Sequence, residues 1–228
     1  MLSAEEWRIL GTSLGVAGRA VIFSLPIAIA FAYALSRPKF PGKPVLDLVA
    51  HLPLALPPVL IGFLLLQAFG RRSAIGSWLE AEFGIRLAFT AEGAALATAV
   101  MAFPLMVRAI RLSFEATDGG LFEAASVLRA GPWDRFMSLA LPLAWPGVLA
   151  GAVTAFAAGL GEFGAVITFA SNVPGETQTL PLAIYSALQV PNGEALALRL
   201  AAISMFAAVV GLVAAELLQR WARRRLEA

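Results

Sequence analysis

Few side chains in this sequence have the types and spacing that covalent chemistry requires. Gly11 to Gly15 match the G-x-S-x-G pattern that surrounds the nucleophilic serine of many hydrolases. Such a serine needs a base, and His51 is the one histidine among 228 residues. The chain has no cysteine, and one histidine cannot form a metal site alone. The chemistry to weigh is therefore hydrolysis by Ser13 with His51.

The elements that carry these residues have the composition of a membrane protein. Apolar residues make up 59% of the chain and charged residues 14%, whereas soluble domains carry about 25% charged residues. A membrane span needs about 20 mostly apolar residues. The sequence predicts five spans, at 9–35, 45–69, 88–110, 142–170 and 197–219. We therefore predict an all-α integral membrane protein with a single domain, residues 1–228, formed by a bundle of five transmembrane helices.

Three features of the sequence add detail to this predicted bundle. The fourth predicted span is long and rich in glycine, so we expect it to bend, tilt or break near Gly159 to Gly161. A short apolar stretch at 180–188 is predicted as a helix on the outer face, and counting it as a span would give six. Glu5 and Glu6 occupy the place of a signal peptide's basic region, so the first apolar segment is expected to remain as a span.

The distribution of basic residues predicts the orientation. Positively charged residues favour the cytoplasmic side of a membrane protein. If the N-terminus is outside and the C-terminus is cytoplasmic, eleven basic residues lie on the inner side and five on the outer side. The inner residues are Arg37, Lys39, Lys43, Arg108, Arg111, Arg129, Arg135, Arg220, Arg223, Arg224 and Arg225; the outer ones are Arg8, Arg71, Arg72, Arg86 and Arg199. In this topology Ser13 lies near the outer face and His51 near the inner face, which argues against the hydrolase.

The longest run that mixes charged and apolar residues is Glu123 to Pro142, within the predicted cytoplasmic loop 111–141. Residues 123–128 favour a short helix, Gly131 and Pro132 indicate a turn, and Leu141-Pro142 opens the next apolar run. A connection of this length usually carries structure or function. Two interpretations fit: a docking helix for a cytoplasmic partner, or an amphipathic helix lying on lipid headgroups.

This segment resembles the EAA loop of bacterial ABC-importer permeases. Glu123, Ala124 and Ala125 match its first three residues, Leu139 stands at its isoleucine position, and Leu141-Pro142 match its end. Arg129 occupies the position of the family's glycine, and the nearest glycine is Gly131, which would move the turn two residues along. The resemblance implies that this loop is the coupling helix, seated in a cleft of the ATP-binding subunit.

Other stretches resemble the molybdate permease subunits of this family. They are Phe103 to Arg108, Gly161 to Gly164 and Pro174 to Leu182. The resemblance implies a homodimer in the bacterial inner membrane, with its pathway on the twofold axis. Two cytoplasmic ATP-binding subunits and a periplasmic oxyanion-binding protein would complete the importer. ATP and magnesium would bind the partner ATPase, leaving this chain without a cofactor. The lipid bilayer is the remaining partner.

The sequence agrees with an ATP site on another polypeptide. It has no G-x-x-x-x-G-K-[ST] pattern, and its Gly42-Lys43 is followed by proline. A passive channel is a weaker alternative, because it has no use for a cytoplasmic docking helix. Tungstate and sulfate stay open as substrates, and a net charge of +2 gives no support to nucleic-acid binding.

Gly161, Glu162, Phe163 and Gly164 form the second candidate site. Glu162 lies about 30 Å along a helix from Pro142, near the outer interface, and an ionisable residue beside a span is a functional candidate. A carboxylate would repel an anionic substrate, so we expect Glu162 to shape the outer mouth or gate through hydrogen bonds. The alternative is a carboxylate that simply reaches outer water.

Four smaller features have plain structural interpretations. His51 is expected to be an interfacial residue, and Arg19 either meets a water-filled path or pairs with Glu5 or Glu6. The Gly11…Gly15 and Gly147…Gly151 spacings predict close helix packing. The basic segment 220–225 is expected to anchor the last helix at the anionic cytoplasmic leaflet.

Overall fold

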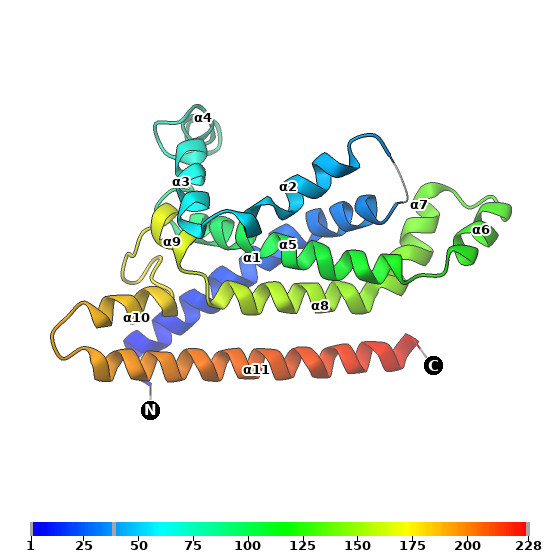
Figure 1. Cartoon of the computed structure of the whole chain (residues 1–228). Coiled ribbons are helices and arrows are strands. Elements are labelled where there is room, and N and C mark those ends of the chain that lie inside the picture. Colours follow the sequence, from blue (N-terminus) through cyan, green and yellow to red (C-terminus); the bar gives the residue numbers. More distant parts are fainter. Residues whose placement is uncertain (1, 38–39, 227–228) are drawn as a thin grey trace.

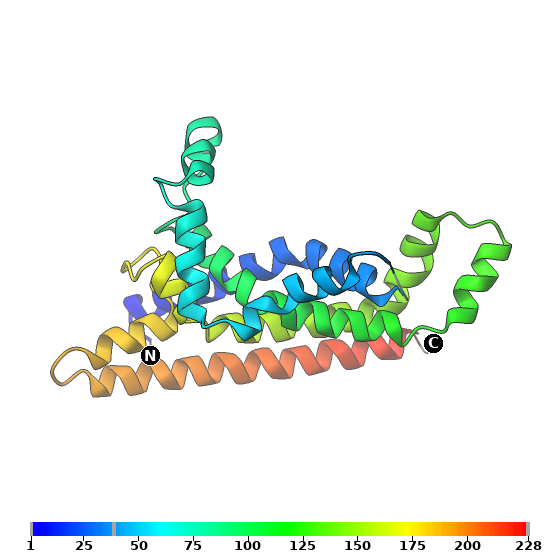
Figure 2. The same cartoon turned by 45° about the horizontal axis from the view of Figure 1, so that its top comes forward.

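The computed structural model describes residues 2–37 and 40–226; for residues 215 and 218–226 the backbone alone is described. Four long helices lie side by side and set the long axis of the molecule (Figures 1 and 2). They are α1 (Ala4–Ser36), α5 (Ala91–Glu115), α8 (Leu141–Leu160) and α11 (Glu194–Leu226). The shorter elements are α2 (Lys43–Ala55), α3 (Pro58–Phe69), α4 (Ala74–Phe83), α6 (Gly119–Val127), α7 (Pro132–Arg135), a π-helical turn η1 (Phe136–Ala140), α9 (Gly164–Phe169) and α10 (Leu180–Leu188).

Small residues on α8 allow the centre of the bundle to pack tightly. A Cβ at Gly147 would lie 2.2 Å from Ser113 Cβ, and one at Gly151 would lie 3.0 Å from the Met106 carbonyl, so α8 presses directly on α5. Packing through Gly147…Gly151 is therefore confirmed. No described helix of this chain packs closely on Gly11…Gly15, because a Cβ at Gly11 would meet nothing within 4 Å.

The second predicted span is not one continuous helix. Within 45–69 the chain forms α2 and α3, which meet at 116°. Leu56 is extended (ψ 146°) and two prolines follow it, because proline disfavours the helical region for the residue before it. After this bend α3 and α4 leave the bundle together (Figure 2). Helix α4 was not predicted.

The fourth predicted span breaks where the sequence indicated but starts earlier. Helix α8 ends at Leu160, with Gly161 as its C-cap, and α9 begins at Gly164. The predicted start at 142 coincides with the start of α8 at Leu141, and the helical segment extends further back through η1 and α7 to Pro132. The loop expected over 111–141 is shorter for the same reason, and because α5 continues to Glu115.

The remaining elements follow the sequence. The spans predicted at 9–35 and 197–219 lie within α1 and α11, and that at 88–110 largely coincides with α5. Helix α10 covers 180–188 as predicted. By length and composition four described helices could cross a membrane, or five if α2 and α3 form one broken span, in agreement with the predicted five.

Ion pairs tie the long helices together in the half of the bundle opposite α6. Arg19 on α1 pairs with Glu92 on α5 at 3.0 Å, so the alternative pairing of Arg19 with Glu5 or Glu6 is wrong. Glu6 is buried and pairs instead with Arg199 on α11 at 2.8 Å. Each pair joins two helices that are far apart in sequence.

Candidate functional site

Helix α6 extends beyond the ends of α5 and α8, on the connection between them (Figure 1). A helix was predicted over 123–128, and α6 starts earlier because the Asp118 carboxylate accepts a hydrogen bond from the Gly120 N–H at 2.9 Å. This is an N-cap, which satisfies a free backbone donor of the first turn. No residue of α6 is buried. Val127 is 82% exposed, as is Leu128 just after the helix.

The turn that ends α6 is at Arg129. This residue has φ +59°, the left-handed conformation usually given to glycine after a helix. The Arg129 N–H bonds the Ser126 carbonyl and the Ala130 N–H bonds the Ala125 carbonyl, each at 3.0 Å, which is a Schellman motif. The expected shift of the turn to Gly131 is therefore wrong. Gly131 has φ −64° and serves as the N-cap of α7.

The structure separates the residues of the EAA-like pattern into two groups. Glu123 and Ala124 are exposed on α6, and Ala125 is half-buried. Leu141 packs against the hydrophobic core, and Pro142 is exposed in the first turn of α8. The first group can be reached by a partner, while the second belongs to the bundle.

An aromatic cluster connects the α6 loop to the bundle. The ring of Phe136 in η1 lies 4.6 Å from Tyr33 on α1 and 5.8 Å from Trp133 on α7, between ring centroids. Tyr33 in turn lies 5.3 Å from Phe114 on α5. Rings at these distances pack as favourable pairs. The cluster was missed in the sequence, where its members are up to about a hundred residues apart.

The π-helical turn lies between the aromatic cluster and α8. The Leu141 N–H bonds the Phe136 carbonyl, five residues back. Pro142 has no N–H, so the regular i→i−4 ladder is interrupted at the next residue. Such turns are frequently found at functional sites, and this one joins α6 and α7 to a long helix.

The second candidate site, Gly161 to Gly164, lies towards the other end of the bundle. The Glu162 carboxylate accepts a hydrogen bond from the Ala165 N–H at 2.8 Å and so caps α9. The Phe163 ring lies 5.2 Å from that of Tyr185. A Cβ at Gly164 would lie 2.7 Å from Pro58 Cβ, so the α8–α9 break packs against the α2–α3 break.

Ser13 and His51 do not form a catalytic pair. The buried Ser13 hydroxyl donates to the Ile9 carbonyl at 3.0 Å and accepts from the Leu180 N–H at 2.7 Å. The His51 ring contacts Asp47, on the turn before it. Ser13 therefore joins α1 to α10. In the described part of the chain, no group of three His, Asp or Glu residues could hold a metal ion.

Sequence reasoning also missed a charge network on α2 and α5. Asp47 contacts His51 at 3.3 Å and Arg111 at 3.1 Å, and Arg111 also pairs with Glu115 at 2.7 Å. The available signal was the i, i+4 spacing of Asp47 with His51 and of Arg111 with Glu115, which brings side chains together on one helix face.

The comparison with protein families matches residues 24–227 to the family described as "binding-protein-dependent transport system inner membrane component". The chain belongs to this family. As a member, it is the multi-pass inner-membrane permease of an ABC transporter and is not itself catalytic. Such a transporter also contains a periplasmic binding protein and ATPase subunits.

Similar proteins match this permease over nearly its whole length. It is 53% identical over 225 residues to the molybdenum transport system permease protein ModB of Escherichia coli K12, covering 99% of this chain and 98% of that protein. It is 50% identical to ModB of Haemophilus influenzae, covering 96% and 93%. The solved structure of a bacterial alginate ABC transporter, with a bound periplasmic protein, has a chain that matches with a TM-score of 0.72 at 18% identity, covering 98% of this chain and 80% of that chain. This last likeness supports the fold alone.

Proposed function

We propose that this permease carries molybdate across the inner membrane, receiving it from a periplasmic binding protein by alternating access. The observation that carries this proposal is the 53% identity to a molybdenum transport permease over 99% of the chain. Because the aligned region covers nearly the whole chain, it includes the residues that line the transport pathway. The protein's own contribution is movement of rigid helices around the pathway.

We propose that α6 couples transport to ATP hydrolysis on the partner subunit. The support is geometric: α6 is capped at both ends by its own sequence, stands clear of the bundle and leaves Val127 and Leu128 exposed. An exposed apolar end of this kind fits a groove on a protein partner. The aromatic cluster would transmit a displacement of α6 to α1 and α5. An interfacial helix on lipid headgroups is the competing interpretation.

The proposed orientation puts the N-terminus outside and α6 and the C-terminus in the cytoplasm. The excess of basic residues at the α6 end supports it. The proposed assembly is a homodimer of the single domain 1–228, with one ATP-binding subunit on each copy. The projecting pair α3 and α4 supports a second copy, because Phe63, Leu64, Trp78 and Phe83 are exposed there.

We also propose that Gly161 to Gly164 act as the outer hinge or gate. This proposal is supported by the contact between two broken spans: the α8–α9 break lies against the α2–α3 break. Residues at element ends absorb the backbone changes of rigid-body motions. Glu162 would hold the start of α9 in place during the movement.

The experiment is uptake of labelled molybdate by cells that lack this protein, with and without the intact chain. We expect the intact chain to restore uptake, and Glu123→Arg to abolish it. Excess unlabelled tungstate should compete, because its size and charge are nearly those of molybdate, and excess sulfate should not. No restoration by the intact chain, or equal competition by sulfate, would remove the molybdate assignment.

A further inference from the structure

The charge network on α2 and α5 leaves one neighbouring cation without a partner. Asp47 is already shared by Arg111 and His51, and Glu115 by Arg111. Arg108, one turn before Arg111 on α5, is exposed. Among the side chains that the structure describes, none forms a hydrogen bond, ion pair or ring contact with Arg108. The guanidinium thus keeps all of its donors free.

Arg108 lies inside α5, a helix long and apolar enough to span a membrane, and towards the end that the basic residues assign to the cytoplasm. It is seven residues before Glu115, the last residue of α5, which places it about 10 Å from that end of the helix. A charged side chain in a span is costly and usually meets a partner, a water-filled cavity or a transported ion. The other arginine deep in a described span, Arg19, has its carboxylate partner in Glu92.

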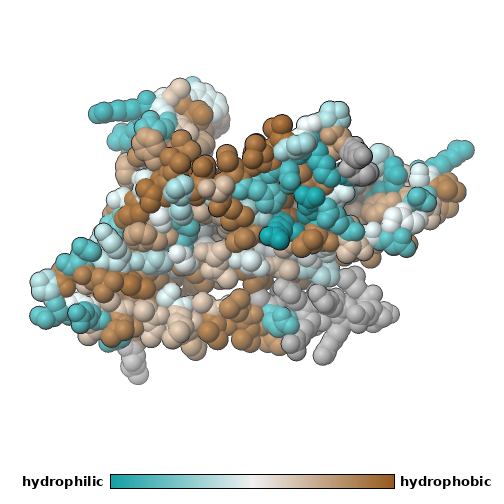
Figure 3. All heavy atoms as spheres, viewed as in Figure 1, coloured by the Kyte–Doolittle hydropathy of each residue, from teal (hydrophilic) through white to brown (hydrophobic). Residues whose placement is uncertain are grey.

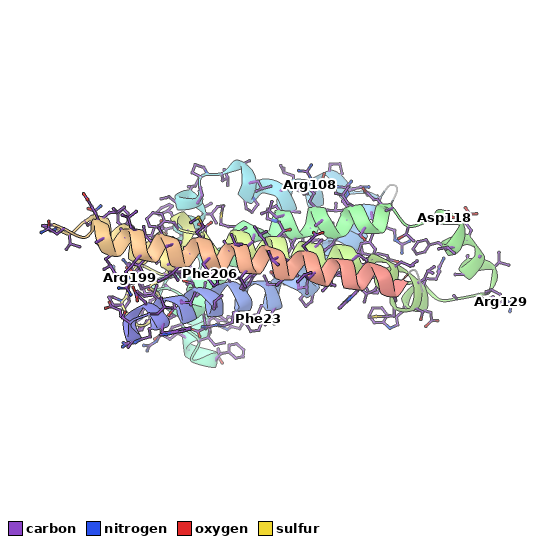
Figure 4. The ribbon with its side chains drawn as sticks, turned by 90° about the horizontal axis from the view of Figure 1, so that it is seen from below. Phe23, Arg108, Asp118, Arg129, Arg199 and Phe206 are labelled. Atoms are coloured by element: carbon purple, nitrogen blue, oxygen red, sulfur yellow. The ribbon has the colours of Figure 1, made fainter. Side chains whose placement is uncertain are left out.

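Arg108 is on the face of α5 that contacts α2 through Arg111 and Asp47. Helices α2 and α5 run in opposite directions (Figure 1). His51, one turn beyond Asp47 on α2, and Arg108, one turn before Arg111 on α5, are therefore at the same level. Figure 3 shows hydrophilic residues gathered over this part of α2 and α5, beside hydrophobic surface. Figure 4 shows Arg108 and Phe23, a residue exposed on α1, on opposite sides of the bundle.

We propose that Arg108 is a transient binding residue for the transported oxyanion in the α6-side half of the pathway. This inference rests on the proposed import of molybdate, a tetrahedral dianion. A guanidinium has five donors in a planar fork that matches paired oxyanion acceptors. Because Arg108 has no carboxylate partner to displace, the anion can bind it and leave again. The Asp47–Arg111–Glu115 network holds the adjacent surface in shape without competing for the anion.

The test uses the whole transporter, with its ATPase subunits and periplasmic binding protein, reconstituted into lipid vesicles. Molybdate uptake and ATP hydrolysis are measured together for the wild type, Arg108→Gln and Arg108→Lys. The matched control is Arg72→Gln, which removes an exposed arginine from the turn between α3 and α4. All variants are compared at equal amounts of assembled complex.

We expect Arg108→Gln to lower molybdate moved per ATP by about tenfold or more, the scale of a lost charged hydrogen bond. ATP hydrolysis and the half-saturating molybdate concentration, which the binding protein sets, should change little. Arg108→Lys should recover part of the ratio, and Arg72→Gln should behave as the wild type.

Three results would overturn the assignment. An unchanged ratio in Arg108→Gln would show that the anion does not need Arg108. Equal losses of uptake and ATP hydrolysis would assign Arg108 to a lipid headgroup or to packing, and a similar fall in Arg72→Gln would make the effect nonspecific. Absence of molybdate uptake by the wild-type complex is a separate outcome, which would reject the proposed substrate instead.

Discussion

The hydroxyl of Ser13 on α1 accepts a hydrogen bond from the backbone N–H of Leu180, 167 residues away and the first residue of α10. Both groups are buried. The hydroxyl of this serine, which matches a nucleophile pattern, therefore links two helices by a hydrogen bond. The contact gives the first N–H of α10 an acceptor on another helix and so fixes the start of α10 against α1.

Replacing Ser13 should therefore lower the stability of the fold, because its hydroxyl has a structural role and not a catalytic one. Ser13→Ala leaves the Leu180 N–H buried without an acceptor, which costs about 1–3 kcal/mol. We expect a lower Tm in detergent, measured by thermal unfolding. Ser77→Ala, at an exposed position of α4, is the control and should change Tm little. An unaltered Tm with lost transport would instead indicate a direct role for the hydroxyl.

Position 129 should accept glycine better than any other amino acid. Its φ of +59° is unfavourable for a side chain but not for glycine, so Arg129→Gly is expected to stabilise the end of α6 by about 0.5–1 kcal/mol. Arg129→Ala removes the same charge and keeps the strain. Hydrogen exchange of residues 124–130 should be slower in Arg129→Gly than in Arg129→Ala; equal exchange in the two would contradict the assigned turn.

The contact between α5 and α8 should not accept a larger residue. Gly147→Ala places a methyl group 2.2 Å from Ser113 Cβ, and overpacking of this kind costs about 1–3 kcal/mol. We expect a lower Tm and less folded protein. Gly18→Ala, on α1 where a Cβ meets nothing within 4 Å, should leave Tm unchanged or raise it slightly. Similar losses in both variants would argue against this helix contact.

The exposed end of α6 should govern partner binding. Val127→Asp puts a charge into the surface that we assign to the ATPase, so recovery of the ATPase subunits with the purified permease should fall by about tenfold or more. Ile85→Asp, at an exposed position near α4, should leave recovery unchanged. Undiminished recovery in Val127→Asp would favour the interpretation of α6 as a helix lying on lipid.

Glu162 can be tested by separating its hydrogen bond from its charge. Glu162→Gln retains an oxygen that can accept from the Ala165 N–H, and Glu162→Ala does not. If the side chain acts as the cap of α9, glutamine should preserve most uptake and alanine should reduce it, with a cost of about 1 kcal/mol in stability. Equal loss of uptake in both variants would show that the negative charge itself is required.

The sequence alone determined the class of this protein, because composition and the length of apolar runs decide whether a chain can reside in a bilayer. It also located the break near Gly159 to Gly161, the short helix at 180–188 and the exposed EAA-like segment. These features depend on local composition and on residues close together in the chain.

Tertiary structure decided the rest, through contacts between residues far apart in sequence. Sequence could not show that α3 would leave the bundle, although Leu56-Pro57-Pro58 marked a break, since the direction depends on packing against α9 through Gly62 and Gly164. Nor could it show that the turn stays at Arg129, where the Schellman hydrogen bonds hold a residue other than glycine in the left-handed conformation. It showed an arginine at 108, but only the folded chain shows that the nearby carboxylates are already bound to Arg111 and leave Arg108 free.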